Sequence, residues 1–99
     1  MSAQKTDTLA ELRSAIDSVD DKLVALFAKR FALVKRVVRV KKVFGLPAAI
    51  PERIAEVVTR VRRQSTAQGF PPDTAEKLWR QLIADVIEFE EKHLKQTHG

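Results

Sequence analysis

The apolar residues of the N-terminal half follow one another at alternating steps of three and four residues. The stripe they form, called the seam below, consists of Leu9, Leu12, Ile16, Val19, Leu23, Leu26, Leu33, Val37, Val40 and Phe44. A period of 3.5 residues is typical of a coiled-coil helix. A helix from Leu9 to Phe44 would measure roughly 54 Å. Because a compact domain of about 100 residues has a radius of gyration near ~13 Å, this helix must extend beyond its own domain. We therefore predict an intertwined helical homodimer.

Arg30 occupies the seam position between Leu26 and Leu33, where the pattern requires an apolar side chain. A guanidinium on the dry face of a helix is costly unless an anion meets it there. The partner of Arg30 is therefore expected to be either a carboxylate of the protein or a bound anion.

The ends of the long helix carry standard signals. Thr8 followed three residues later by Glu11 is typical of a capping box, and Gly45 and Pro47 supply a stop signal. These residues predict one helix from Leu9 to Phe44.

Two shorter helices are expected after a loop at residues 46–50. Pro51 suits the first turn of a second helix that ends near residues 68–69. The stretch 69–72 reads as a turn, and a third helix is expected from about Asp73 to Lys95 with Leu78 among its inward residues. The prediction is an all-α fold, one single helical domain over residues 1–99, ordered from about 8 to 96 with flexible tails.

The composition of the chain argues against a metal site and a membrane span and points to an anionic partner. The chain has no cysteine and only two histidines, His93 and His98, so we expect no metal site. No apolar run approaches the ~20 residues that a membrane span requires, and residues 1–7 lack the apolar segment of a signal peptide. A cytoplasmic protein with no membrane contact is expected. The net charge of +5 and the acid-free basic run from Lys29 to Lys42 indicate an anionic partner.

Polar residues on inward helix faces are the candidates for a site. Glu90 lies on the same helical stripe as inward apolar residues of the third helix, and Lys41 lies about three turns after Arg30. Arg13 flanks the seam and Arg53 stands in the first turn of the second helix. Each has a simpler interpretation: a structural Arg30–Glu90 salt bridge, a lysine that offsets a helix dipole, or solvated surface charge. Any enzyme built from these residues would use neither a covalent nucleophile nor a metal.

The residues around these candidates resemble the all-α class of chorismate mutase, together with its relative isochorismate-pyruvate lyase. The matching segments are Leu12–Asp17, Val19–Asp20, Leu23–Arg30, Val40–Lys41, Pro51–Arg53 and Leu78–Glu90. The resemblance covers roughly residues 8–96. It implies an intertwined homodimer of three-helix chains, of chorismate mutase type II, with two equivalent sites.

The resemblance also implies roles for single residues. Arg13 would reach the partner's site and Arg30 would pair with a substrate carboxylate. Lys41 would bind a carboxylate and the ether oxygen of a dicarboxylate substrate, Arg53 would add positive charge, and Glu90 would approach the ether oxygen. Since the rearrangement of chorismate to prephenate is pericyclic, no cofactor is expected, and the catalytic set would be Lys41, Glu90 and Arg30.

The chain departs from the pattern of the mutases at three positions. Glu90 replaces a common glutamine, so the resemblance implies that its protonated form is the active one. Ile54 stands where many mutases have a carboxylate for the ring hydroxyl, and Val86 where some have a small hydroxyl residue. Ile54 and Val86 are therefore expected to contact the ring, and they leave open whether chorismate or isochorismate is the main substrate.

Two functions other than catalysis are also compatible with the sequence. The basic run also suits a small helical module that binds nucleic acid, although aromatic residues do not interleave with its cations and Arg30 points inward on the period. A plain dimerisation coiled coil is a third possibility. Our preferred prediction is a chorismate mutase without a nucleic-acid partner; the alternative is a lyase that forms salicylate and pyruvate.

Overall fold

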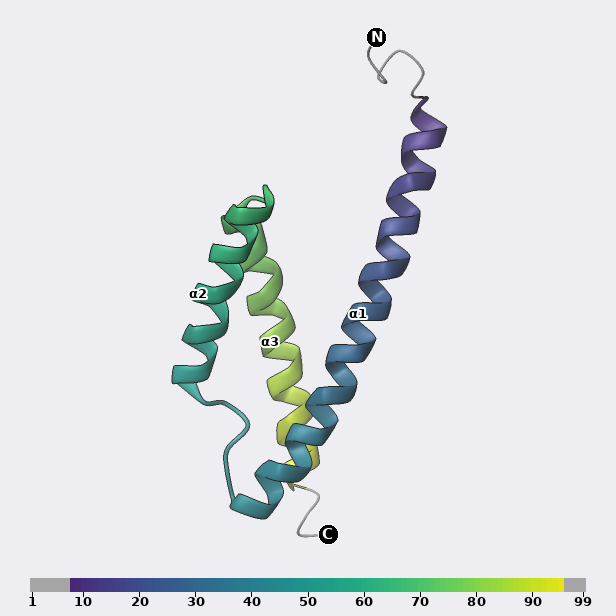
Figure 1. The fold of residues 1–99 in the computed structure, drawn as a ribbon. Helices are drawn as coiled ribbons and strands as arrows, with labels where there is room; N and C mark the ends of the chain where they lie inside the picture. The colour runs from purple at the N-terminus through teal and green to yellow at the C-terminus, as the bar shows by residue number, and fades with distance from the viewer. Residues whose placement is uncertain (1–7, 96–99) are drawn as a thin grey trace. The chain divides into compact units, whose positions relative to one another are not determined.

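The chain forms three α-helices and no strand within residues 8–95, the part that the computed structural model describes. Helix α1 spans Leu9–Phe44, α2 spans Pro51–Gln68 and α3 spans Pro72–Lys95 (Figure 1). The predicted all-α class and the bounds of α1 and α2 are confirmed. Helix α3 begins one residue earlier than expected, because a proline lacks only an N–H that the first turn leaves unpaired anyway. The predicted flexible tails, residues 1–7 and 97–99, lie outside the described residues, as does residue 96, which was expected to be ordered.

The capping box at the start of α1 is present as predicted. The backbone N–H of Thr8 donates to Glu11 Oε1 at 3.2 Å, and the N–H of Glu11 donates to the Thr8 hydroxyl at 3.1 Å. Two of the amide groups that a helix start leaves without partners are thereby satisfied.

The chain divides into two compact units, Met1–Leu33 and Val34–Gly99. In the first unit, the described part of which is the N-terminal portion of α1, no described residue is buried. Every residue of the seam is exposed, from 44% at Val37 to 70% at Phe44. The single chain leaves these large apolar side chains uncovered. That another chain covers them stays a prediction.

The second unit holds the small core. Its buried apolar residues are Val34, Val38, Ala48, Val58 and Ala75. Val34 and Val38 each lie one position beyond a seam residue, so this part of α1 has one covered face and one exposed face. The expectation that Leu78 points inward is wrong for the single chain, because its side chain is 54% exposed. The covered line of α3 runs through Ala75, and Leu78 lies beside that line.

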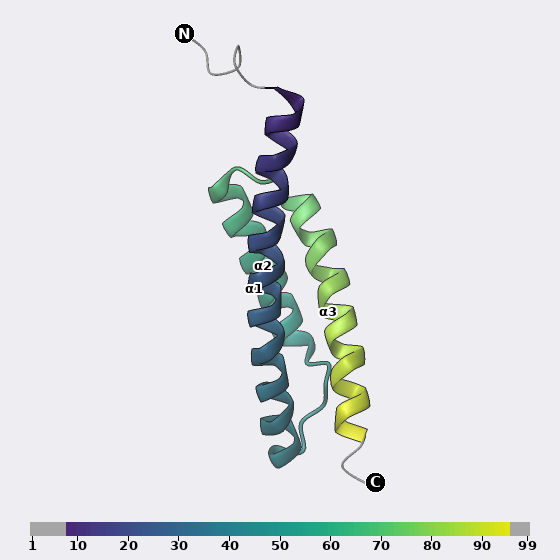
Figure 2. The same cartoon turned by 90° about the vertical axis from the view of Figure 1, so that its right-hand side faces the viewer.

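Helices α2 and α3 pack side by side as a hairpin (Figures 1 and 2). Gly69 ends α2 with a φ of 80°, a left-handed conformation that favours glycine. The N–H of Phe70 then donates to the carbonyl of Ser65 at 2.8 Å, which completes the cap.

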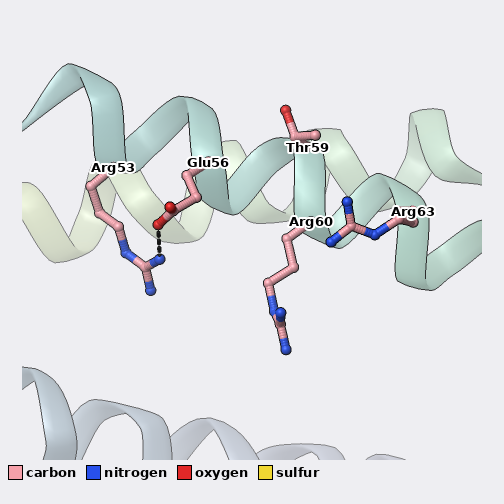
Figure 3. Close-up of a pocket in the computed structure, with 5 residues that line it drawn as sticks. All are labelled: Arg53, Glu56, Thr59, Arg60 and Arg63. Atoms are coloured by element: carbon pink, nitrogen blue, oxygen red, sulfur yellow. Dashed lines mark hydrogen bonds and ion pairs between the residues drawn. The ribbon is translucent and has the colours of Figure 1, made fainter.

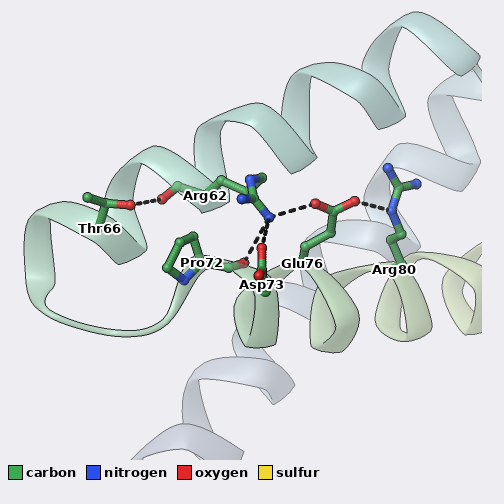
Figure 4. Close-up of polar contacts among 6 residues, drawn as sticks. All are labelled: Arg62, Thr66, Pro72, Asp73, Glu76 and Arg80. Carbon is green, nitrogen blue, oxygen red and sulfur yellow. Dashed lines mark hydrogen bonds and ion pairs between the residues drawn. The ribbon is translucent and has the colours of Figure 1, made fainter.

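Ion pairs hold the closed end of this hairpin together (Figure 4). Arg62 Nη1 of α2 lies 3.0 Å from Asp73 Oδ1 and 2.9 Å from Glu76 Oε1, both on α3. Arg80 Nε donates to the other oxygen of Glu76 at 2.6 Å. Hydrogen bonding from Arg80, reinforced by Arg62, keeps the pKa of the Glu76 carboxyl below its ordinary value of 4.5.

None of the described helices combines the length and the apolar character that crossing a bilayer would require.

Candidate functional site

Lys41 and Glu90 form a largely buried ion pair within the second unit. The Nζ atom of Lys41, in the last turn of α1, lies 2.7 Å from Oε1 of Glu90 on α3. The two side chains are only 12% and 7% exposed. The expectation that Glu90 lies on the covered side of the third helix is confirmed. Lys41 therefore does more than offset the dipole of its helix.

A backbone group completes the coordination of Lys41. Its Nζ also donates to the carbonyl oxygen of Ala48 at 2.8 Å. Ala48 is buried in the loop between α1 and α2. This loop begins at Gly45, whose φ is 64°. Sequence reasoning missed Ala48, because a carbonyl is carried by every residue and only the Gly45 and Pro47 signals marked this loop as special.

The ammonium group of Lys41 has one N–H donor that no acceptor among residues 8–95 uses. An ammonium group carries three N–H donors, and Glu90 and Ala48 accept two of them. The third can donate to an oxygen of a small anion. Because the carboxylate of Glu90 already neutralises the charge of Lys41, an anionic ligand at this position must compete with Glu90 or bind while Glu90 is protonated.

The structure places Arg53 on the surface of α2. Its side chain is 65% exposed and is ion-paired with Glu56 one turn further on (Figure 3). A hollow of about 590 Å³ runs along this helix and is lined by Arg53, Glu56, Thr59, Arg60 and Arg63. Neither Lys41 nor Glu90 lines this hollow, and the ion-pair partner of Arg53 is Glu56.

The two apolar candidates lie partly covered on the hairpin. Ile54 on α2 and Val86 on α3 are both half-buried. Val86 stands one turn before Glu90 on the same helix face, which places an apolar side chain beside the ion pair.

Arg13 and Arg30 belong to the first unit. Arg13 is exposed, and Arg30 is half-buried. Every other described residue of this unit is exposed. Neither arginine makes an ion pair with any residue between 8 and 95. The carboxylate of Glu90, one of the partners considered for Arg30, is already paired with Lys41.

Histidine contributes to helix structure here. Nδ1 of His93 lies 2.9 Å from the carbonyl oxygen of Phe89 one turn earlier, and His98 lies outside the described residues. Across residues 8–95 no three His, Cys, Asp or Glu side chains gather as metal ligands would.

The sequence of this chain is similar to one protein family and to several known enzymes. The family profile described as chorismate mutase type II matches residues 12–91. The chain is 30% identical to a chorismate mutase of Methanocaldococcus jannaschii over 94% of each chain. It is 33% identical to an isochorismate pyruvate lyase of Pseudomonas aeruginosa over 92% of this chain and 89% of that protein. A T-protein of Enterobacter agglomerans is 43% identical over 78% of this chain, which spans only 21% of the length of that relative.

Proposed function

Because this chain belongs to the chorismate mutase type II family, we propose that it catalyses the rearrangement of chorismate to prephenate. The observation that carries the proposal is the buried Lys41–Glu90 pair, with an ammonium held by two acceptors at 2.7 and 2.8 Å. Prephenate is a precursor of phenylalanine and tyrosine, so the role would be in aromatic amino acid biosynthesis, in the cytoplasm.

The proposed mechanism needs no proton or hydride transfer. One bond between carbon and the ether oxygen breaks while a carbon–carbon bond forms, and negative charge grows on the oxygen. The remaining donor of Lys41 would stabilise that charge, and its two protein acceptors pre-orient it. Arg30 and Arg53 would hold the substrate carboxylates in the folded, reactive conformation.

Glu90 would act beside Lys41 on the same oxygen. A protonated Glu90 can donate a hydrogen bond to the ether oxygen, whereas its carboxylate would repel that oxygen and compete for Lys41.

The site would be completed by a second copy of the chain. The exposed seam supports an intertwined homodimer, because ten large apolar side chains on one stripe of α1 are uncovered in the single chain. In such a dimer, Arg13 of one copy would enter the site of the other. We propose a small dicarboxylate as the ligand and no nucleic-acid or membrane partner.

The alternative function is that of an isochorismate-pyruvate lyase. It is favoured by Ile54 and Val86, two half-buried apolar residues expected at the ring end of the substrate. Neither side chain can accept a hydrogen bond from a ring hydroxyl. The lyase would use the same cations and would release pyruvate and salicylate.

Incubation of the purified chain with each substrate separately tests both functions. Chorismate should be converted to prephenate, and Lys41→Ala should reduce kcat/KM by at least about a hundredfold because a donor to the ether oxygen is lost. Lys42→Ala, which alters an exposed neighbour, is the matched control and should retain activity. Salicylate fluorescence from isochorismate without prephenate formation would favour the lyase, and turnover of neither substrate would contradict both proposals.

A further inference from the structure

Helix α2 carries two exposed arginines, Arg60 and Arg63, that have no counter-ion among residues 8–95. Arg60 and Arg63 line the same hollow as Arg53, but Glu56 pairs with Arg53 only (Figure 3). Neither Arg60 nor Arg63 makes an ion pair with another described residue. Like charges three residues apart on a helix repel each other, so this face of α2 favours an anionic partner.

The opposite charge is found on the N-terminal part of α1. All four acidic residues of α1 precede Lys22, and Glu11 among them is used in the cap. Asp17 and Asp20 are exposed and have no ion-pair partner between residues 8 and 95. They share one helix face with Arg13, at steps of four and three residues.

The two charged faces have matching spacings. Asp20 follows Arg13 by seven residues, and Arg60 follows Arg53 by seven residues. Each step corresponds to about 10.5 Å along a helix. If Arg13 of one copy enters the site of another copy near Arg53, and the two helices run in the same direction, Asp20 lies level with Arg60. Asp17 then lies three residues before Arg60, and Arg63 three residues after Asp20, so each is within one helical turn of a partner.

We propose that Asp17 and Asp20 of one copy pair with Arg60 and Arg63 of a second copy, and that these ion pairs set the register that delivers Arg13 to the site. The inference rests on the homodimer and the site of the proposed function. The apolar seam supplies affinity but repeats along the helix, so a shift by one heptad would still bury apolar residues. Charged flanking pairs select one register and disfavour the others.

Two charge-reversed chains test the pairing. In Arg60→Glu/Arg63→Glu the new glutamates repel Asp17 and Asp20 of the other copy. In Asp17→Lys/Asp20→Lys the new lysines repel Arg60 and Arg63 of the other copy. Each homodimer should dissociate at least about tenfold more readily than the wild type, a loss of roughly 1.4 kcal/mol. When the two chains are mixed, both interfaces of the heterodimer regain opposite charges, and sedimentation should show dimers of wild-type stability.

Arg36→Glu/Arg39→Glu is the matched control. It reverses two exposed arginines at the same spacing on α1. When it is mixed with Asp17→Lys/Asp20→Lys, one of the two interfaces still sets lysine against arginine, so these heterodimers should remain less stable than the wild type. Recovery of wild-type stability with the control chain, or charge-reversed homodimers as tight as the wild type, would overturn the proposal. Binding of a small anion at Arg60 and Arg63, without any effect on dimerisation, would also overturn it.

Circular dichroism establishes whether the variants fold. If a charge-reversed chain is unfolded, the neutral variant Arg60→Gln/Arg63→Gln decides: the salt dependence of dimer dissociation should become weaker, and an unchanged salt dependence would contradict the pairing. These measurements use no substrate. A chain that dimerises by this register but does not convert chorismate would refute the proposed function and leave the inference intact.

Discussion

Two side chains and one carbonyl, those of Lys41, Glu90 and Ala48, form the centre of the site proposed above. A buried ion pair is costly to assemble and becomes more costly when one partner is removed. Here the lysine has two acceptors within hydrogen-bonding distance and one donor to spare. This geometry suits a site that must be neutral without a ligand and must receive an anionic one.

Exchange of Glu90 for glutamine separates the two roles of that residue. Glu90→Gln keeps a donor for the ether oxygen and removes the competing carboxylate. The variant should match or exceed the kcat/KM of the wild type at neutral pH, and it should lack the rise in activity that we expect of the wild type towards acidic pH. Initial rates of chorismate consumption from pH 5 to 8 measure this.

Glu88→Gln is the matched control for Glu90→Gln, because Glu88 is exposed on the same helix. Its pH profile should follow that of the wild type. A wild-type profile that is already flat over this range would contradict the role assigned to a protonated Glu90.

At the scale of elements, the α2–α3 hairpin is the support of the site. Glu90 and Val86 lie on α3, and the helix is joined to α2 by the Arg62 and Glu76 network at the closed end (Figure 4). Sequence periodicity did not single out these ion pairs, because Arg62 and Glu76 lie on different helices and become neighbours only when the turn at Gly69 closes.

This network should make stability depend on pH. Since the folded chain holds the pKa of Glu76 below its ordinary 4.5, its ionised form stabilises the fold. That stabilisation is present in full above about 4.5 and is lost as the pH falls through the lower, folded-state value. Urea unfolding should show Glu76→Gln less stable than the wild type at pH 7, with the difference vanishing at strongly acidic pH.

Asp85→Asn provides the comparison, because Asp85 is exposed on α3, accepts a hydrogen bond from Gln81 and makes no ion pair with any residue between 8 and 95. Its stability difference from the wild type should be smaller at pH 7. A Glu76→Gln difference that persists unchanged at strongly acidic pH would show that the ion pairs do not cause it.

At the scale of the whole molecule, the cations proposed for the site are divided between the two units of the single chain. The seam is exposed along the whole of α1. The dimer proposed above would supply both the missing apolar cover and the missing arginine. Activity would then depend on association.

Mixing two inactive variants tests that dependence. Arg13→Ala and Lys41→Ala should each lose activity, but a heterodimer contains one site with its own Lys41 and with Arg13 from the other copy. Random reassociation in a symmetric dimer should restore about one quarter of wild-type activity. No recovery after mixing, with heterodimers demonstrated by mass spectrometry, would show that Arg13 acts within its own chain or not at all.

Sequence alone determined the features that depend on local periodicity. The steps of three and four residues predicted α1, Thr8 and Glu11 predicted its cap, and the break in the seam singled out Arg30. These are properties of one helix, where neighbours in space are set by neighbours in sequence. The period of α3 also placed Glu90 on its covered face.

Tertiary structure decided which of these residues meet. It paired Glu90 with Lys41, added the carbonyl of Ala48, and left Leu78 exposed. Such contacts join residues up to 49 positions apart, and they depend on how the loop and the hairpin close. A helical pattern tells which face a side chain occupies, but only the packing of one helix against another decides what that face meets.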